Sequence, residues 1–212
     1  MTIRQTDTVP TGIDIIDREL GGGIPRGSVV ALSAVPASQS ELFLYEFADT
    51  RQTVYLSTVR TRDAVEWTLE NRGVDLDAVE IIQADSEDPL EHAQWVLADL
   101  PDETNLVVDP AGVLEDSDDG DYRQFLADLK QSAGEGGNVA LLHCLDGPSP
   151  PTHRCDTVHV ADLVFELSTT LDGQSVINRL TVPKFRGGQS VEDVIKLDLT
   201  SEVEVDMSRN IV

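Results

Sequence analysis

The sequence predicts an α/β fold with a mostly parallel central sheet flanked by helices. Short apolar runs alternate with amphipathic stretches from Ser28 to Leu167, as in a parallel sheet covered by helices. The stretches between the runs carry apolar residues at three- and four-residue spacing, which is typical of helices packed on a core. The expected strands are Val29–Leu32, Thr53–Ser57, Val79–Gln83, Asn105–Asp109, Asn138–His143 and Leu163–Leu167.

The expected helices occupy the intervals between these strands. They are a helix that carries Leu42, Phe43, Tyr45 and Phe47, and the segments Arg62–Asn71, Pro89–Leu100 and Tyr122–Ser132. Gly73 and Gly134 stand where helix C-caps are expected, because glycine readily adopts the left-handed conformation that ends a helix. Residues 115–121 are expected to form an acidic loop, and residues 147–151 a proline-rich one.

The end of the chain changes character and predicts an antiparallel edge to the sheet. Asp172-Gly173 is a hairpin turn signal between residues 163–169 and 175–182, and a further alternating strand is expected over residues 194–199. A length of 212 residues leaves little room for a second core, and no internal repeat is present. We therefore expect one domain over residues 1–212: an N-terminal segment over 1–27, an α/β core over 28–167 and antiparallel strands over 168–212.

Acidic residues dominate the composition. The formal net charge is −24, with 39 Asp and Glu against 15 Lys and Arg, and the acid is spread along the whole chain. Such a surface repels itself and nucleic acid in dilute buffer, but the Debye length falls to ~3 Å at molar salt. The composition favours a protein from a halophilic, archaeal type of cytoplasm; an ordinary acidic regulator is the alternative.

Targeting and metal-binding signals are weak. No apolar run approaches the ~20 residues of a membrane span, and the N-terminus lacks the apolar stretch of a signal peptide, so we expect a cytoplasmic protein without membrane partners. Cys144 and Cys155 fit a reduced cytosol. They lie near histidines, but the spacing matches no zinc pattern, so no metal site is expected.

Several motifs indicate a family. Residues 11–17 read TGIDIID and residues 20–28 read LGGGIPRGS, directly before the first strand. Asp109 ends an apolar strand, residues 161–164 read ADLV, and residues 184–187 read KFRG. This pattern resembles the KaiC-like ATPases of the RecA superfamily, including its RadA-like branch. The resemblance implies a RecA-like P-loop fold, with Asp109 at the Walker B position. In family members that bind ATP, the cations corresponding to Lys184 and Arg186 reach the phosphates of a neighbouring subunit's nucleotide.

The phosphate-binding loop of that family is degenerate here. A working loop has the form G-x-x-x-x-G-K-T, in which backbone N–H groups cradle phosphate, the lysine supplies charge and the hydroxyl holds Mg²⁺. The substituted positions are Ala34 and Ala37 for glycines, Gln39 for the glycine before the lysine, Ser40 for the lysine and Glu41 for the hydroxyl residue. These changes remove a positive charge and add a negative one, so nucleotide binding is doubtful.

Two further features of the sequence agree with a loop that does not bind phosphate. Residues 38–41 have the S-x-x-E form of a capping box, in which Ser38 and Glu41 satisfy the helix N-terminus. Family ATPases also end their second strand with a glutamate that polarises the attacking water, whereas here the strand runs into Thr58-Val59-Arg60. Asp63 is expected in the first turn of the next helix. The sequence thus assigns no catalytic residue.

The leading hypothesis is a KaiC-like pseudo-ATPase that acts as a regulatory or signalling protein-interaction module without a cofactor. Its partner would be another protein, such as an active KaiC-like relative, or further copies of the chain, with Lys184 and Arg186 at the interface. The first alternative is an ATPase that binds ATP and Mg²⁺ with a rebuilt loop, in which Arg26 or a neighbour's Lys184 and Arg186 restore the charge. A weaker alternative is a RadA-like recombination mediator, which the acidic composition disfavours.

Overall fold

A nine-stranded sheet forms the centre of the molecule in this computed structural model, which describes residues 8–173, 175–189, 191–199 and 203–205. The strand order is β11-β10-β9-β8-β3-β7-β6-β4-β5, and the six strands from β8 to β5 run parallel. The strands are β3 (Val29–Ala34), β4 (Thr53–Ser57), β5 (Val79–Gln83), β6 (Asn105–Asp109), β7 (Val139–Leu145), β8 (Leu163–Asp172), β9 (Ser175–Phe185), β10 (Ile195–Leu199) and β11 (Val203–Val205).

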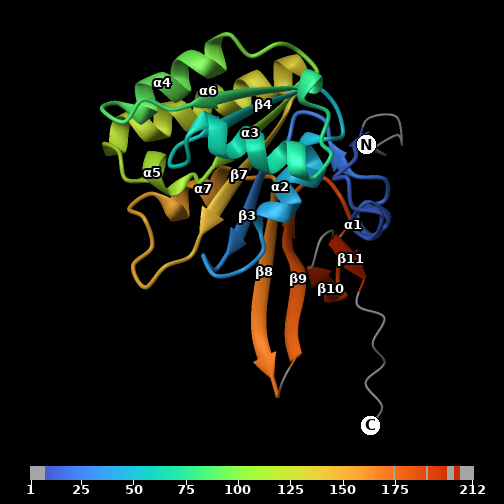
Figure 1. The fold of residues 1–212 in the computed structure, drawn as a ribbon. Helices are drawn as coiled ribbons and strands as arrows, with labels where there is room; N and C mark the ends of the chain where they lie inside the picture. Colours follow the sequence, from blue (N-terminus) through green and yellow to red (C-terminus); the bar gives the residue numbers. More distant parts are fainter. Residues whose placement is uncertain (1–7, 174, 190, 200–202, 206–212) are drawn as a thin grey trace.

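Helices lie on both sides of this sheet (Figure 1). They are α1 (Asp14–Glu19), α2 (Glu41–Ala48), α3 (Arg62–Asn71), α4 (Pro89–Ala98), α5 (Gly112–Glu115), α6 (Asp119–Gly136) and α7 (Arg154–Val160), with a 3-10 turn at Leu76–Ala78. The side chains of β3 alternate between two apolar clusters, with Val30 and Leu32 facing α2 and α3, and Val29 and Ala31 facing α4 and α6. The predicted α/β class with a mostly parallel sheet is confirmed.

The predicted antiparallel edge is also confirmed. β8 and β9 form a hairpin with Asp172 paired to Ser175, and β10 and β11 add to it in antiparallel register. The hairpin extends away from the helical layers (Figure 1), and its tip exposes Leu171 and Val176.

Two local predictions about helix ends and loops are wrong. Gly134 lies inside α6, and the helix ends at Gly137, which has the left-handed conformation with φ of 65°. The predicted acidic loop over residues 115–121 is interrupted by helix at both ends, since α5 includes Glu115 and α6 begins at Asp119. Glu115 is fully buried against Arg154, a long-range pairing that no local pattern indicates. Gly73, by contrast, follows α3 with φ of 78°, as predicted.

The N-terminal motif packs against α2. The Thr11 N–H donates to the Asp17 carboxylate (2.7 Å), and the Thr11 hydroxyl accepts from the Ile13 N–H (3.1 Å). Gly12 has φ of 84°, and a Cβ there would lie 2.4 Å from the carbonyl oxygen of Glu46 on α2. These residues therefore fix the segment to the core. Among the described helices, none is long and apolar enough to cross a bilayer.

Candidate functional site

The degenerate phosphate-loop positions lie at the carboxyl edge of the parallel strands, where ligands bind in open α/β sheets. β3 ends at Ala34, the loop runs from Val35 to Ser40, and α2 begins at Glu41. Ala37 and Gln39 are exposed, whereas Ser40 is only 1% exposed. The strand–loop–helix arrangement expected from the sequence is therefore present, and the residue at the lysine position points into the protein.

The predicted capping box does not form. Ser40, not Ser38, occupies the N-cap position of α2, and no side chain caps the helix there. Ser40 has helical angles (φ −63°, ψ −24°), so the Leu42 N–H and the Phe43 N–H bond back to the carbonyls of Gln39 and Ser40. The Ser38 hydroxyl instead lies within hydrogen-bonding distance of the Val35 carbonyl (2.7 Å) and the Ser40 hydroxyl (3.0 Å).

Two hydrogen bonds connect a buried serine to a histidine and that histidine to an aspartate. Ser40 Oγ lies 2.9 Å from His143 Nε2, and His143 Nδ1 lies 2.7 Å from Asp109 Oδ1. His143 comes from β7 and is fully buried, and Asp109 ends β6 and is 3% exposed. The order β3-β7-β6 brings the three elements together, because their carboxyl ends meet at one edge of the sheet.

The second oxygen of Asp109 is held by β4 and the loop after it. Asp109 Oδ2 accepts from the Tyr55 hydroxyl (2.7 Å) and from the Arg60 guanidinium (2.6 Å). Arg60 also donates to the hydroxyls of Tyr45 and Tyr55, each at 2.8 Å. Ser57, at the end of β4, accepts from the Arg60 N–H (3.1 Å). This bond fixes the turn that directs Arg60 back to Asp109.

These contacts keep Asp109 ionised. Burial raises the pKa of Asp109, but hydrogen bonds from His143 and Tyr55 and the positive charge of Arg60 outweigh it and bring the pKa to about 2. Burial together with the Asp109 charge raises the pKa of Tyr55 well above its usual value, so the phenol stays a donor. In the neutral imidazole, Nδ1–H then faces the carboxylate, and we assign the lone pair of Nε2 to accept from Ser40 O–H.

Lys184 and Arg186 contact the end of a helix in their own chain. Lys184 Nζ donates to the carbonyls of Val158 and His159 (2.8 and 2.9 Å), and Arg186 donates to that of His159 (3.1 Å). Cations at the C-terminus of α7 suit the partial negative charge of the helix end. Because Lys184 pairs with Val164 near the start of β8, both cations lie at the amino edge of the sheet, away from Ser40.

Arg26 cannot restore the lost charge of the phosphate loop within its own chain. It precedes β3, whereas the loop follows it, and six strand residues span about 20 Å. Arg26 is paired with Glu103 at 2.5 Å instead. The expectation that Asp63 belongs to the first turn of α3 is confirmed.

The cysteines and histidines considered for metal binding are dispersed. Cys144 is fully buried, and burial raises the pKa of its thiol, whereas Cys155 is exposed. His153 approaches Asp119 and Asp156, but Arg123 already pairs with both carboxylates, at 3.0 and 3.1 Å. An arginine within the group weakens its attraction for a cation.

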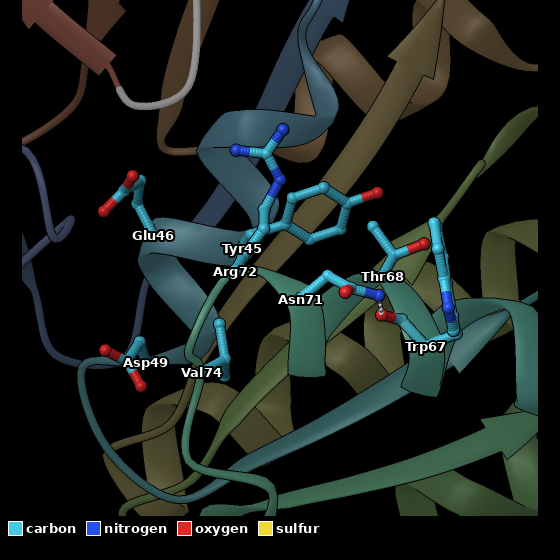
Figure 2. A pocket seen from close by; sticks show the side chains of 8 residues that line it. All are labelled: Tyr45, Glu46, Asp49, Trp67, Thr68, Asn71, Arg72 and Val74. Atoms are coloured by element: carbon cyan, nitrogen blue, oxygen red, sulfur yellow. Dashed lines mark hydrogen bonds between the residues drawn. The ribbon is translucent and has the colours of Figure 1, made fainter.

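A pocket of about 470 Å³ lies between α2 and α3, next to the Asp109 network (Figure 2). Tyr45 belongs to both features, because its hydroxyl accepts from Arg60 and its ring is 5.5 Å from the Arg72 guanidinium carbon. Trp67 lines the pocket and is 67% exposed. The lining residues are Tyr45, Glu46, Asp49, Trp67, Thr68, Asn71, Arg72 and Val74.

Three members of the network, Tyr55, Arg60 and His143, were not assigned to the site from the sequence. The sequence predicts His143 only as the last residue of an apolar strand near Cys144, and Tyr55 only as an apolar strand residue. A usable signal exists: Ser57, Asp109 and His143 are polar residues at or near the carboxyl ends of the buried strands β4, β6 and β7. Such residues converge on one edge of a parallel sheet.

Residues 8–212 match the model of a family described as "Family of unknown function (DUF7125)". Comparison with curated proteins finds no match.

Proposed function

This chain belongs to the DUF7125 family of unknown function, and we propose that it is a KaiC-like pseudo-ATPase with a RecA-like fold that works by binding other proteins. The observation that carries the proposal is the state of Asp109. Both of its carboxylate oxygens already have partners, His143 on one and Tyr55 with Arg60 on the other. A Walker B aspartate needs its oxygens for Mg²⁺ and its waters.

The side chain at the lysine position supports the same conclusion. The Ser40 side chain carries no charge and is bonded to His143 inside the protein, so it cannot replace the ammonium group of the lysine. Glu41 follows as the first residue of α2 and adds negative charge at the helix N-terminus. A nucleotide would therefore meet repulsion where an active relative provides attraction.

A binding role fits the surface near the site. An exposed tryptophan beside a pocket is a common anchor in protein interfaces, because it buries a large area at little entropic cost. Trp67 has this setting, between α2 and α3. A regulatory or signalling partner, such as an active KaiC-like relative, is the class that the proposal names. Lys184 and Arg186 are secondary candidates for such an interface, since the side chain of Arg186 remains 52% exposed.

Titration calorimetry with Mg-ATP at about 1 M salt, where surface repulsion is screened, tests the proposal. We expect no saturable heat up to millimolar nucleotide. Arg60→Ala removes the guanidinium from Asp109, and Arg62→Ala, an exposed arginine nearby, is the matched control. Micromolar binding by the unmodified chain, together with turnover, would overturn the proposal in favour of an active ATPase with a rebuilt loop.

A further inference from the structure

A line of hydroxyl groups connects the His143–Asp109 pair to the protein surface. Ser40 Oγ is 2.9 Å from His143 Nε2, and Ser38 Oγ is 3.0 Å from Ser40 Oγ. Ser40 is 1% exposed, so no substrate reaches it, whereas Ser38 is half-buried on a loop whose neighbours Ala37 and Gln39 are exposed. Ser38 is thus the outer end of the line.

The charges fix the direction in which protons can move along this line. Asp109 is ionised and accepts from His143 Nδ1–H, which leaves the Nε2 lone pair of the neutral ring for Ser40 O–H. The oxygen of Ser40 can then accept from Ser38 O–H. A proton leaving Ser38 passes to Ser40 while the proton of Ser40 passes to His143, and Asp109 stabilises the resulting imidazolium.

We propose that Ser38 is a nucleophile for acyl transfer from activated esters, deprotonated through Ser40 by the His143–Asp109 pair. Ser38 Oγ attacks the carbonyl carbon, and its proton reaches His143 through Ser40. The carbonyl oxygen becomes an oxyanion. When the tetrahedral intermediate collapses, the carbon–alkoxide bond breaks, and the leaving alcohol takes the proton back along the same path. Water then hydrolyses the acyl-serine by the same two steps.

The surrounding backbone supports this chemistry. The Ser38 hydroxyl can also donate to the Val35 carbonyl at 2.7 Å, so a rotation about its C–O bond completes or interrupts the line without moving the chain. In the part of the chain that the structure describes, the N–H groups of Gln39 and Ser40 donate to no protein acceptor. They lie at the positive end of α2, where an oxyanion is stabilised.

This proposal can be tested independently of the pseudo-ATPase proposal, because it does not depend on whether the chain binds a nucleotide. The test uses the full chain at molar salt and a fluorophosphonate probe, in which a serine oxygen–phosphorus bond forms and fluoride leaves. We expect mass spectrometry to find the label on Ser38, and release of nitrophenolate from p-nitrophenyl acetate to follow the same pattern. Ser38→Ala should abolish both.

Three variants separate a proton relay from a structural role. Ser40→Ala interrupts the line and should slow labelling by about 100-fold, the usual value of a general base, while Ser40→Thr keeps a hydroxyl and should retain labelling. His143→Gln can still bond to Ser40 and Asp109 but cannot take up a proton, so it should slow labelling as much as Ser40→Ala. Ser33→Ala is the matched control, since Ser33 is a neighbouring half-buried serine that donates to Asp146 (2.7 Å).

Thermal melts identify any variant that fails to fold. If His143→Gln fails to fold, the comparison of Ser40→Ala with Ser40→Thr tests the relay. The proposal is overturned if Ser38 is labelled no faster in the folded protein than after denaturation. It is equally overturned if the label attaches elsewhere, or if Ser40→Ala and His143→Gln label as fast as the unmodified chain.

Discussion

Two buried carboxylates, Asp109 and Glu115, lie six residues apart and illustrate different uses of a buried charge. Each is paired with an arginine: Asp109 with Arg60 at 2.6 Å and Glu115 with Arg154 at 2.8 Å. Glu115 is fully buried, and its further partner is the Thr157 hydroxyl at 2.6 Å, which lies 2.7 Å from the Tyr122 hydroxyl inside the core. Arg154 also pairs with Asp146 at 2.8 Å, and the Asp146 side chain is 49% exposed, so this network reaches the surface as an ion pair.

The Asp109 network reaches the surface at a hydroxyl group, that of Ser38, instead. Its arginine side chain is 30% exposed, against 9% for Arg154, and its histidine continues through Ser40 toward the surface. The difference teaches that burial alone does not mark a functional site. A network that ends in an ion pair stabilises the fold, whereas one that ends on a surface hydroxyl can also support chemistry.

Breaking the Glu115 pair should have the largest effect. Arg154→Met leaves a carboxylate without its charge partner in the core, and we expect a loss of about 3–5 kcal/mol in the free energy of unfolding, measured by urea titration at molar salt. Arg123→Met is the control, because its ion pair with Asp119 is exposed and contributes about 0–1 kcal/mol. A loss as small as that of Arg123→Met would show that Glu115 is easily protonated once Arg154 is removed. It would contradict the difference between the two networks.

Acidification should weaken the Asp109 network next. The folded pKa of about 2 lies below the ordinary value of 3.8, so the contribution is complete above pH 4 and is lost as the pH falls from about 4 to about 2. We expect about 2 kcal/mol over that window in the difference between the unmodified chain and Asp109→Asn. Parallel stability curves for the two proteins would contradict this assignment.

Removing one tyrosine hydroxyl from each network should have different effects on the free energy of unfolding. Tyr55→Phe removes a bond to a charged oxygen, with an expected cost of about 1.5 kcal/mol, whereas Tyr122→Phe removes a neutral bond to Thr157, at about 1 kcal/mol or less. Tyr55→Phe should also reduce the loss of stability between pH 4 and pH 2, because without this donor the pKa of Asp109 moves back toward its ordinary value of 3.8. Chemical denaturation at neutral and acid pH measures both effects, and the reverse order would argue against an ionised Asp109.

The smallest effect on stability should come from Trp67, whose exposed side chain belongs to the pocket beside the Asp109 network. Trp67→Ala should change the free energy of unfolding by no more than about 0.5 kcal/mol but reduce the capture of a native protein partner. Trp95→Ala, on α4 and 63% exposed, is the matched control. Equal capture by both variants would show that the pocket takes no part in partner binding.

The sequence predicts the strands well because each is a continuous apolar run. It also shows that some strands end in polar residues, but not which of these residues contact one another. Asp109 and Ser40 were assigned from motif positions, but their pairing with His143 depends on the strand order, which is set by contacts across 34 and 103 residues. Arg60 is separated from Asp109 by 49 residues in the sequence. The S-x-x-E pattern failed because Ser40 has helical angles and occupies the N-cap position, so Ser38 lies before the N-cap and does not cap the helix.

The fit of Gly12 against α2 has a consequence for how activities are transferred between relatives. The TGIDIID segment is held by contacts of Thr11, Gly12 and Asp17 that serve packing and do not involve the loop after β3. The signature therefore reports how the N-terminal segment packs, and it carries no information about the chemistry of the site. An activity should be inferred instead from the residues at the carboxyl ends of β3, β6 and β7, where Ser40, His143 and Asp109 meet.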